Sequence, residues 1–240
     1  MKIALAQLNP IVGDLAGNTE LILAAASEAR AAGADILLTP ELALTGYPPE
    51  DLLLRPAFLA ECRKMIGRFI DEVDGITLVV GHPFGDSVER FNCATVIRDG
   101  HILGRYEKML LPNDTVFDEV RYFTPGCSPL VFEQDGIKVG VLICEDLWEV
   151  DPASAAADEG AQVVERDVAG ARQGQRDADH EQREQGVERR RDKPTGGIAQ
   201  GVGMLGEVAV HGVMRRAGGR VQGAGRAARG GPSTADREWR

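Results

Sequence analysis

The first 164 residues of this 240-residue chain predict an α/β fold built from layers of helices and mixed sheets. Short runs rich in Val, Ile and Leu alternate with longer segments of helical periodicity, as expected for strands separated by helices. Two Asp-Gly pairs, at 99–100 and 135–136, each join two such runs and predict β-hairpins. Hairpins pair strands antiparallel, whereas helical crossovers pair them parallel, so we expect both arrangements in one fold.

The N-terminal elements follow from periodicity and from one glycine. A strand at 2–9 precedes a helix at 18–32, in which apolar and small residues recur on one face. Gly33 ends this helix, because glycine readily adopts the left-handed conformation common after helix C-termini. The next strand is expected at 34–41.

The later elements of this domain are identified by the same signals. In chain order they are a helix at about 56–73, a buried strand at 77–83, a hairpin at 91–108, a second hairpin at 130–144, a helix at 152–160 and the start of a strand at 161–164.

The chain changes character near residue 164. Residues 1–164 hold 12 basic and 26 acidic residues, whereas residues 165–240 hold 15 and 11, and 14 of those 15 bases are arginine. The second segment has one aromatic residue, one leucine and one isoleucine, so we expect no sustained strand or amphipathic helix in it. Its stretch GRVQGAGRAARGG resembles a GC-rich gene translated in the wrong reading frame. A native Arg/Gly-rich disordered tail is the alternative interpretation.

Composition excludes several classes of function. A net charge of -10 argues against nucleic acid or an anionic membrane surface as a general partner. No run of about 18 apolar residues predicts a membrane span, and the start MKIALAQLNP is too short and too polar for a signal peptide. The four cysteines (62, 93, 127 and 144) lack metal-ligand spacing, which predicts free thiols in the cytoplasm and no metal site.

Two motifs in the second segment carry little weight. GVGMLG at 201–206 fits a dinucleotide-binding pattern, but no βαβ unit surrounds it. ERRRDK at 188–193 could contact nucleic acid, yet acidic residues flank it.

Three polar residues stand at strand ends, where catalytic groups are often found. Each has an ordinary explanation alone: Glu41 could cap a strand, Lys108 could be a surface lysine, and Cys144 could be a small core residue. Together they could attack an amide, since a thiol needs a base to take its proton and an ammonium can stabilise the oxyanion. Two carboxylates follow Cys144 in ICEDLW and should raise its pKa, an effect that Lys108 would partly offset.

The order of these residues matches a known superfamily. Glu41, then Tyr106-Glu107-Lys108, then Cys144 at the end of a strand resembles the nitrilase (carbon–nitrogen hydrolase) superfamily. The longer stretches TPELALTGYPPEDLL, KMLLPNDTVFDEVRYFTPG and LICEDLW resemble, more narrowly, the N-terminal glutaminase domain of glutamine-dependent NAD(+) synthetases. The resemblance covers essentially all of residues 1–164.

The resemblance implies a fold and a reaction. The fold would be an α-β-β-α sandwich, incomplete in its C-terminal part. Cys144 would attack the side-chain amide of L-glutamine, with Glu41 as general base and then acid and Lys108 holding the oxyanion. A glutamyl thioester would then be hydrolysed to glutamate. Glu119 would orient Lys108 as a further active-site residue.

The same resemblance implies a substrate pocket and partners. Glu145 would meet the α-ammonium of glutamine, and Trp148 and Tyr47 are candidates for the pocket wall. Asp114 replaces an aromatic residue of many relatives at another wall position. The glutaminase step would need no cofactor, whereas ATP and magnesium would serve a synthetase domain that makes NAD(+) from deamido-NAD(+). Relatives form homo-oligomers, and we expect one here.

The chain departs from the family after residue 164. Relatives continue with an asparagine-alanine-serine-proline segment and a downstream arginine that help to bind glutamine, but ERDVAGARQGQRDADHEQ contains neither. The last elements of the sandwich and the synthetase domain are not recognisable either, which favours the reading-frame interpretation. A hydrolase of other small amides and an inactive, truncated product are the alternative functions.

Overall fold

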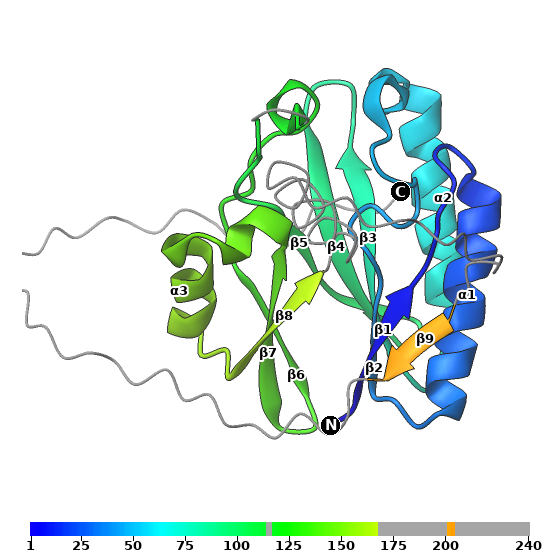
Figure 1. Ribbon diagram of the computed structural model, residues 1–240, viewed down its shortest axis with the longest axis vertical. Helices are drawn as coiled ribbons and strands as arrows, with labels where there is room; N and C mark the ends of the chain where they lie inside the picture. The colour runs from blue at the N-terminus through cyan, green and yellow to red at the C-terminus, as the bar shows by residue number, and fades with distance from the viewer. Residues whose placement is uncertain (114–116, 168–200, 205–240) are drawn as a thin grey trace, which may run out of the picture.

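The computed structural model describes residues 1–113, 117–167 and 201–204 of the chain, and these residues form four layers (Figure 1). The layers are two helices, a six-stranded sheet, a three-stranded sheet and one further helix. The helices are α1 (Leu15–Ala31), α2 (Pro56–Glu72) and α3 (Val150–Asp158). The predicted α-β-β-α sandwich is therefore confirmed, while its predicted C-terminal incompleteness concerns residues outside the described part.

The first sheet has the strand order β5-β4-β3-β2-β1-β9. Its strands are β1 (Ile3–Gln7), β2 (Ile36–Leu38), β3 (Thr77–Gly85), β4 (Arg90–Arg98), β5 (His101–Glu107) and β9 (Gly201–Met204). β1, β2 and β3 pair in parallel, whereas β4, β5 and β9 pair antiparallel with their neighbours.

The second sheet has the order β6-β7-β8, and its strands are β6 (Leu130–Gln134), β7 (Ile137–Ile143) and β8 (Val163–Asp167). β6 pairs antiparallel with β7, and β7 pairs in parallel with β8. Both sheets are therefore mixed, as predicted.

Both predicted hairpin turns are confirmed by their backbone conformation. Asp99 and Gly100 have φ angles of 47° and 78°, and Asp135 and Gly136 have φ angles of 51° and 77°. Positive φ at both central residues defines the turn whose twist matches a two-residue hairpin, which explains the Asp-Gly sequence.

Helix α1 begins three residues earlier than predicted. The Asp14 carboxylate accepts a hydrogen bond from the backbone N–H of Gly17 at 2.9 Å and caps the helix, so its first residue is Leu15. Asn18, the expected start, lies inside the helix with a buried side chain. Its amide nitrogen donates to the carbonyls of Ile11 and Leu44, which ties the loop after β2 to the loop before α1.

Three short 3₁₀ helices were not predicted, because one turn is too short to show a periodic pattern. They are η1 (Glu50–Leu54), η2 (Glu119–Arg121) and η3 (Cys144–Leu147). Strand β9 was not predicted either, and it departs from the expectation of no sustained strand after residue 164. It pairs with β1, whose free backbone edge would otherwise lack a partner.

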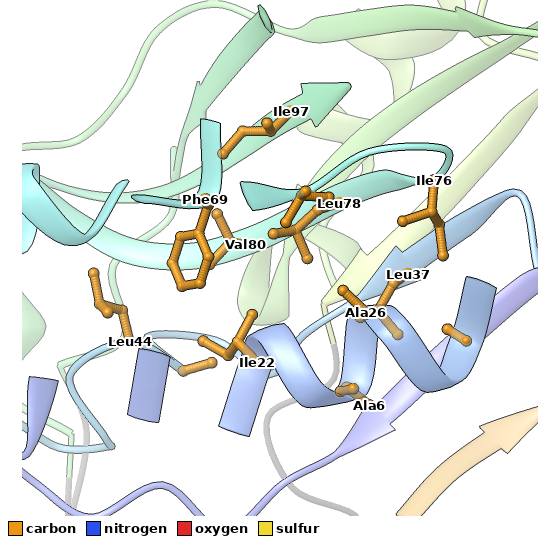
Figure 2. Close-up of a cluster of buried hydrophobic side chains, with 14 of the residues drawn as sticks. Ala6, Ile22, Ala26, Leu37, Leu44, Phe69, Ile76, Leu78, Val80 and Ile97 are labelled. Atoms are coloured by element: carbon orange, nitrogen blue, oxygen red, sulfur yellow. The ribbon is translucent and has the colours of Figure 1, made fainter. Parts of the chain in front are cut away.

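Two apolar clusters fill the space between the layers. One lies between the first sheet and helices α1 and α2, and Figure 2 shows Ile22, Phe69 and Leu78 pointing toward one another in it. Burying a side chain such as Phe69 contributes about 1.5–3 kcal/mol. The other cluster lies between the two sheets and includes Val79, Val96 and Val141. Within the described residues, no helix is both long and apolar enough to cross a membrane.

Candidate active site

Cys144 lies at a sharp turn between β7 and η3. Its φ angle of 46° is in the left-handed region, which costs a residue other than glycine on the order of 1–3 kcal/mol. Ile143 before it is fully buried, whereas Cys144 is half-buried. The turn therefore leaves Cys144 partly exposed at the border of the apolar cluster between the sheets.

The buried Asp146 side chain holds this turn in place. Its Oδ2 accepts hydrogen bonds from the Tyr106 hydroxyl at 2.8 Å and from the Ile143 N–H at 3.3 Å. Its Oδ1 accepts from the N–H groups of Leu110 and Met109 at 2.8 and 3.2 Å. Asp146 thus links the end of β7 to the segment that follows Lys108. The sequence indicated Asp146 only as an acidic neighbour of the thiol, because its partners lie far away in sequence.

Lys108 follows β5 and lies between the carboxylates of Glu41 and Glu119, both of which were predicted as site residues. Its Nζ lies 2.7 Å from Glu41 Oε1 and 3.0 and 2.9 Å from the two carboxylate oxygens of Glu119. All three side chains are buried. The backbone of Lys108 is fixed as well, since its N–H donates to the Asn92 carbonyl and its own carbonyl accepts from Gly126.

Glu41 lies in the loop that follows β2. This loop is held by the Thr39 hydroxyl, which accepts from the Gly81 N–H at 3.0 Å, and by the Leu44 N–H, which donates to the Gly81 carbonyl. Asn92 Nδ2 donates to Glu41 Oε1 at 2.7 Å. Asn92 was not predicted as a site residue. The sequence did contain a signal for it, namely an amide side chain within the otherwise apolar strand FNCATV. A buried polar side chain needs a hydrogen-bond partner, which pointed to another polar group nearby.

One lysine between two buried carboxylates leaves one negative charge in excess. Burial, followed by the charge of Glu41, raises the pKa of Glu119 to about 7. Burial alone would lower the pKa of Lys108, but the charges of Glu41 and Glu119 outweigh it and raise that pKa. The ammonium of Lys108 therefore stays charged at neutral pH.

The thiol is protonated in the free protein. Burial raises the pKa of Cys144 to about 12, the charges of Glu41 and Glu119 add to this effect, and Lys108 opposes it. The expected rise of this pKa and its partial offset by Lys108 are confirmed, and the charges that contribute most are those of Glu41 and Glu119. The backbone N–H of Glu145 lowers the pKa. A contribution from the carboxylates that follow Cys144 stays a prediction. A reaction at this sulfur therefore needs a base to take the proton during attack.

Tyr47 borders this cluster and a cavity beside it. Its hydroxyl donates to Glu119 Oε1 at 3.4 Å, and burial together with the charges of Glu119 and Glu41 raises its pKa. The cavity, of about 300 Å³, is lined by Tyr47, Glu119 and neighbouring residues of the 42–53 and 117–123 segments. Cys144 is not one of its lining residues among those described.

The structure does not gather the other predicted pocket residues as closely. Trp148 is 62% exposed just after η3. Glu145 is half-buried, and its side chain forms no hydrogen bond or ion pair within the described residues. Asp114 lies outside the described residues. In the same part of the chain, no cluster of three or more His, Cys, Asp or Glu side chains could hold a metal ion.

Several curated proteins similar to this chain are named glutamine-dependent NAD(+) synthetase. A glutamine-dependent NAD(+) synthetase of Thermotoga maritima is 48% identical over 169 residues, which are 68% of this chain and 29% of that protein. One of Xylella fastidiosa strain Temecula1 is 48% identical over 167 residues, covering 68% of this chain and 31% of that protein. The chain thus spans about 30% of the length of these relatives.

Solved structures show the same fold. A glutamine-dependent NAD+ synthetase from Acinetobacter baumannii, in complex with ADP, has a TM-score of 0.67 and 37% identity, covering 77% of this chain and 36% of that chain. An amidase from Nesterenkonia sp. has a TM-score of 0.63 and 31% identity, covering 71% and 66%. The sequence model of the family described as Carbon-nitrogen hydrolase matches residues 2–190. The chain belongs to the carbon–nitrogen hydrolase family.

Proposed function

We propose that this chain hydrolyses the side-chain amide of L-glutamine and so releases ammonia. The observation that carries the proposal is the buried Lys108 between Glu41 and Glu119, within electrostatic reach of the Cys144 thiol. The set holds a nucleophile, a base and a fixed cation, which are the groups that amide hydrolysis through a thioester requires.

In the first half of the reaction, Glu41 takes the proton of the Cys144 thiol while the sulfur attacks the amide carbon. The carbonyl oxygen gains a negative charge, which the Lys108 ammonium stabilises. The carbon–nitrogen bond then breaks, and Glu41 returns its proton to the nitrogen, so that ammonia leaves and a γ-glutamyl thioester remains on Cys144.

In the second half, Glu41 takes a proton from a water molecule as the water oxygen attacks the thioester carbon. The carbon–sulfur bond breaks, the sulfur recovers a proton from Glu41, and glutamate leaves. Glu119 holds Lys108 in position throughout through its two oxygens, at 3.0 and 2.9 Å from Nζ. No step is assigned to a metal ion.

The substrate contacts are proposals from the resemblance. Glu145 would bind the α-ammonium of glutamine, and its half-buried carboxylate is free of protein partners in the described residues, which supports this role. Tyr47 would line the pocket from the Glu119 side, in keeping with its hydrogen bond to that carboxylate. Trp148 and Asp114 are the remaining candidates for the wall.

The names of the relatives suggest where the ammonia goes. We propose that it serves the ATP-dependent synthesis of NAD(+) from deamido-NAD(+), and that ATP and magnesium act in that step and not in amide hydrolysis. A cytoplasmic homo-oligomer is part of the same proposal, and size-exclusion chromatography with light scattering tests the assembly.

Ammonia release from L-glutamine by the purified full-length chain tests the function. We expect release by the native sequence, loss of release in Cys144→Ala, and full release in Cys127→Ala, which removes an exposed thiol outside the cluster. Equal rates in Cys144→Ala and the native sequence would refute the assignment of the nucleophile. No release from any amide would favour the inactive product.

A second candidate is a hydrolase of small aliphatic amides. The Nesterenkonia amidase supports it, since a variant of that protein was solved in complex with butyramide. Competition between L-glutamine and butyramide separates the two candidates. We expect glutamine to be hydrolysed with the higher kcat/KM, and a preference for butyramide would support the alternative.

A further inference from the structure

Asn92 contacts the buried cluster of Glu41, Lys108 and Glu119 at more than one point, and hydrogen bonding by its side chain also lowers the pKa of Glu119. It lies in β4, and its side chain is almost completely buried. Its Nδ2 donates to Glu41 Oε1 at 2.7 Å, and its backbone carbonyl accepts the N–H of Lys108 at 2.8 Å. The residue therefore connects the base to the segment that carries the cation.

Only half of this carboxamide is used by the protein. Asn92 Oδ1 is buried and has no hydrogen-bond partner among the described residues. A buried, unpaired acceptor costs free energy, which an apolar side chain of similar shape would avoid. Because an ionised carboxylate can only accept, the amide must turn its N–H toward Glu41. Packing alone does not account for an asparagine here, whereas the need for a neutral donor at Glu41 does.

The two oxygens of Glu41 are held differently. Lys108 Nζ and Asn92 Nδ2 both donate to Oε1, each at 2.7 Å. In the part of the chain that the structure describes, no donor reaches Oε2. We infer that Asn92 is a positioning residue that, together with Lys108, fixes Oε1 of Glu41 and leaves Oε2 to accept the thiol proton of Cys144. This inference rests on the proposed role of Glu41 as the base.

A neutral donor suits this position better than a charged one. The titratable groups of the surrounding cluster are Glu41, Lys108, Glu119, Tyr47 and Cys144. A second cation beside Glu41 would compete with Lys108 for the carboxylates. A carboxamide donates a hydrogen bond to Glu41 without adding a charge and leaves Lys108 as the cation of the cluster.

Alkylation of Cys144 by iodoacetamide across a range of pH tests the inference without requiring turnover. Peptide mass spectrometry of the full-length chain follows each cysteine separately. Cys127 is exposed and serves as the internal standard, whereas Cys62 and Cys93 are buried and report unfolding if they react. The rate of Cys144 alkylation is plotted against pH, and its rise on the acidic side, the lower-pH limb, reports the pH at which the base becomes ionised.

The key variant is Asn92→Leu, which keeps the volume and removes the donor. In this variant we expect the lower-pH limb of Cys144 alkylation to shift to higher pH by about one unit. The reason is that the Glu41 carboxylate loses a hydrogen bond. Asn92→Asp adds a negative charge at the same place and should move the limb further. The same substitution is then made in the Glu119→Gln variant, in which Glu119 can no longer titrate. A shift that persists in this double variant is assigned to Glu41.

Turnover supplies the second readout. In amide hydrolysis, Asn92→Leu should lower kcat by about tenfold or more with little change in KM, since the residue acts on the base and not on the substrate. The inference is overturned if the limb stays at the same pH in both variants. It is also overturned if Cys62 and Cys93 become reactive in both variants, because Asn92 would then be needed for folding. Absence of ammonia release by the native chain refutes the proposed function instead, and the alkylation profiles still decide the role of Asn92.

Discussion

The two faces of the six-stranded sheet are both largely apolar but differ at one end. The face toward α1 and α2 is packed with aliphatic residues and Phe69, and its buried His82 is neutral and paired with Thr95. The face toward the second sheet is equally apolar along most of its length, but it ends in the charged cluster around Lys108. Strand β4 contributes to both faces, because successive side chains point to opposite sides.

The cysteines show what this difference means for chemistry. Cys62 lies in α2 within the helix-side cluster, and mainly burial raises its pKa to about 12. Burial also raises the pKa of Cys144 to about 12, but here two carboxylates and a lysine act on the thiol as well. A high thiol pKa therefore does not separate a core cysteine from a nucleophile. The neighbouring base and cation do.

The largest effect is expected for Lys108→Met, on the charged face. Removing the cation leaves Glu41 and Glu119 buried beside each other, which should lower the free energy of unfolding by about 3–5 kcal/mol and abolish ammonia release. Urea unfolding and an ammonia assay measure the two effects. Lys64→Met, which breaks an exposed pair with Glu61, is the control and should cost less than about 1 kcal/mol. Equal costs would contradict the account of the cluster.

On the apolar face, Leu78→Ala should reduce stability without changing the chemistry. Leu78 is fully buried in the helix-side cluster, so the cavity should cost about 2–5 kcal/mol (Figure 2). The kcat of the folded fraction should remain near that of the native sequence. Leu103→Ala, at an exposed position, is the matched control. A large fall in kcat for Leu78→Ala would mean that the two faces are coupled.

A smaller effect is expected for Tyr106→Phe, in the hydrogen bond that joins β5 of the first sheet to the turn after β7 of the second. The change removes one donor from Asp146, which keeps its three backbone N–H donors, and should cost about 1.5–3 kcal/mol. Tyr122→Phe removes an exposed hydrogen bond to Asp51 and should cost less. Thermal unfolding of both variants checks the order, and the reverse order would show that Asp146 does not depend on this hydroxyl.

A dependence of stability on pH is the smallest effect when it is expressed per pH unit. The pKa of Glu119 is raised to about 7 from an ordinary 4.5, so the folded protein binds a proton more readily than the unfolded chain between these values. Its contribution to the free energy of unfolding therefore decreases as pH rises from about 4.5 to about 7, by at most about 1.4 kcal/mol per pH unit. Urea unfolding at several pH values should show that the free energy of unfolding falls less, or rises more, between pH 4.5 and 7 in Glu119→Gln than in the native sequence. Parallel profiles would contradict the shift.

The sequence was informative wherever a local signal sufficed. The hairpins followed from Asp-Gly pairs, and Glu41, Lys108 and Cys144 followed from polar residues at strand ends in a recognisable order. The start of α1 was misplaced because Asp14 and Asn18 are both good capping residues, and only the fold shows that Asn18 is buried between two loops.

What the sequence could not provide were contacts between distant segments. Asp146 and Tyr106 are 40 positions apart, and Asn92 and Glu41 are 51 apart, so no spacing rule connects them. The carboxylates of Glu41 and Glu119, which raise the pKa of the Cys144 thiol, are likewise distant from it in sequence. The boundary at residue 164 and the reading-frame interpretation remain predictions, since most of the residues concerned lie outside the described part.

The central claim is that Cys144 acts as the nucleophile within the Glu41–Lys108 cluster. Mass spectrometry of the full-length chain, quenched in acid during incubation with L-glutamine, tests it most directly. The account predicts a γ-glutamyl adduct on the peptide that contains Cys144, and no adduct on the peptides of Cys62, Cys93 or Cys127. Ammonia release without any adduct on Cys144, or an adduct on another cysteine, would contradict it.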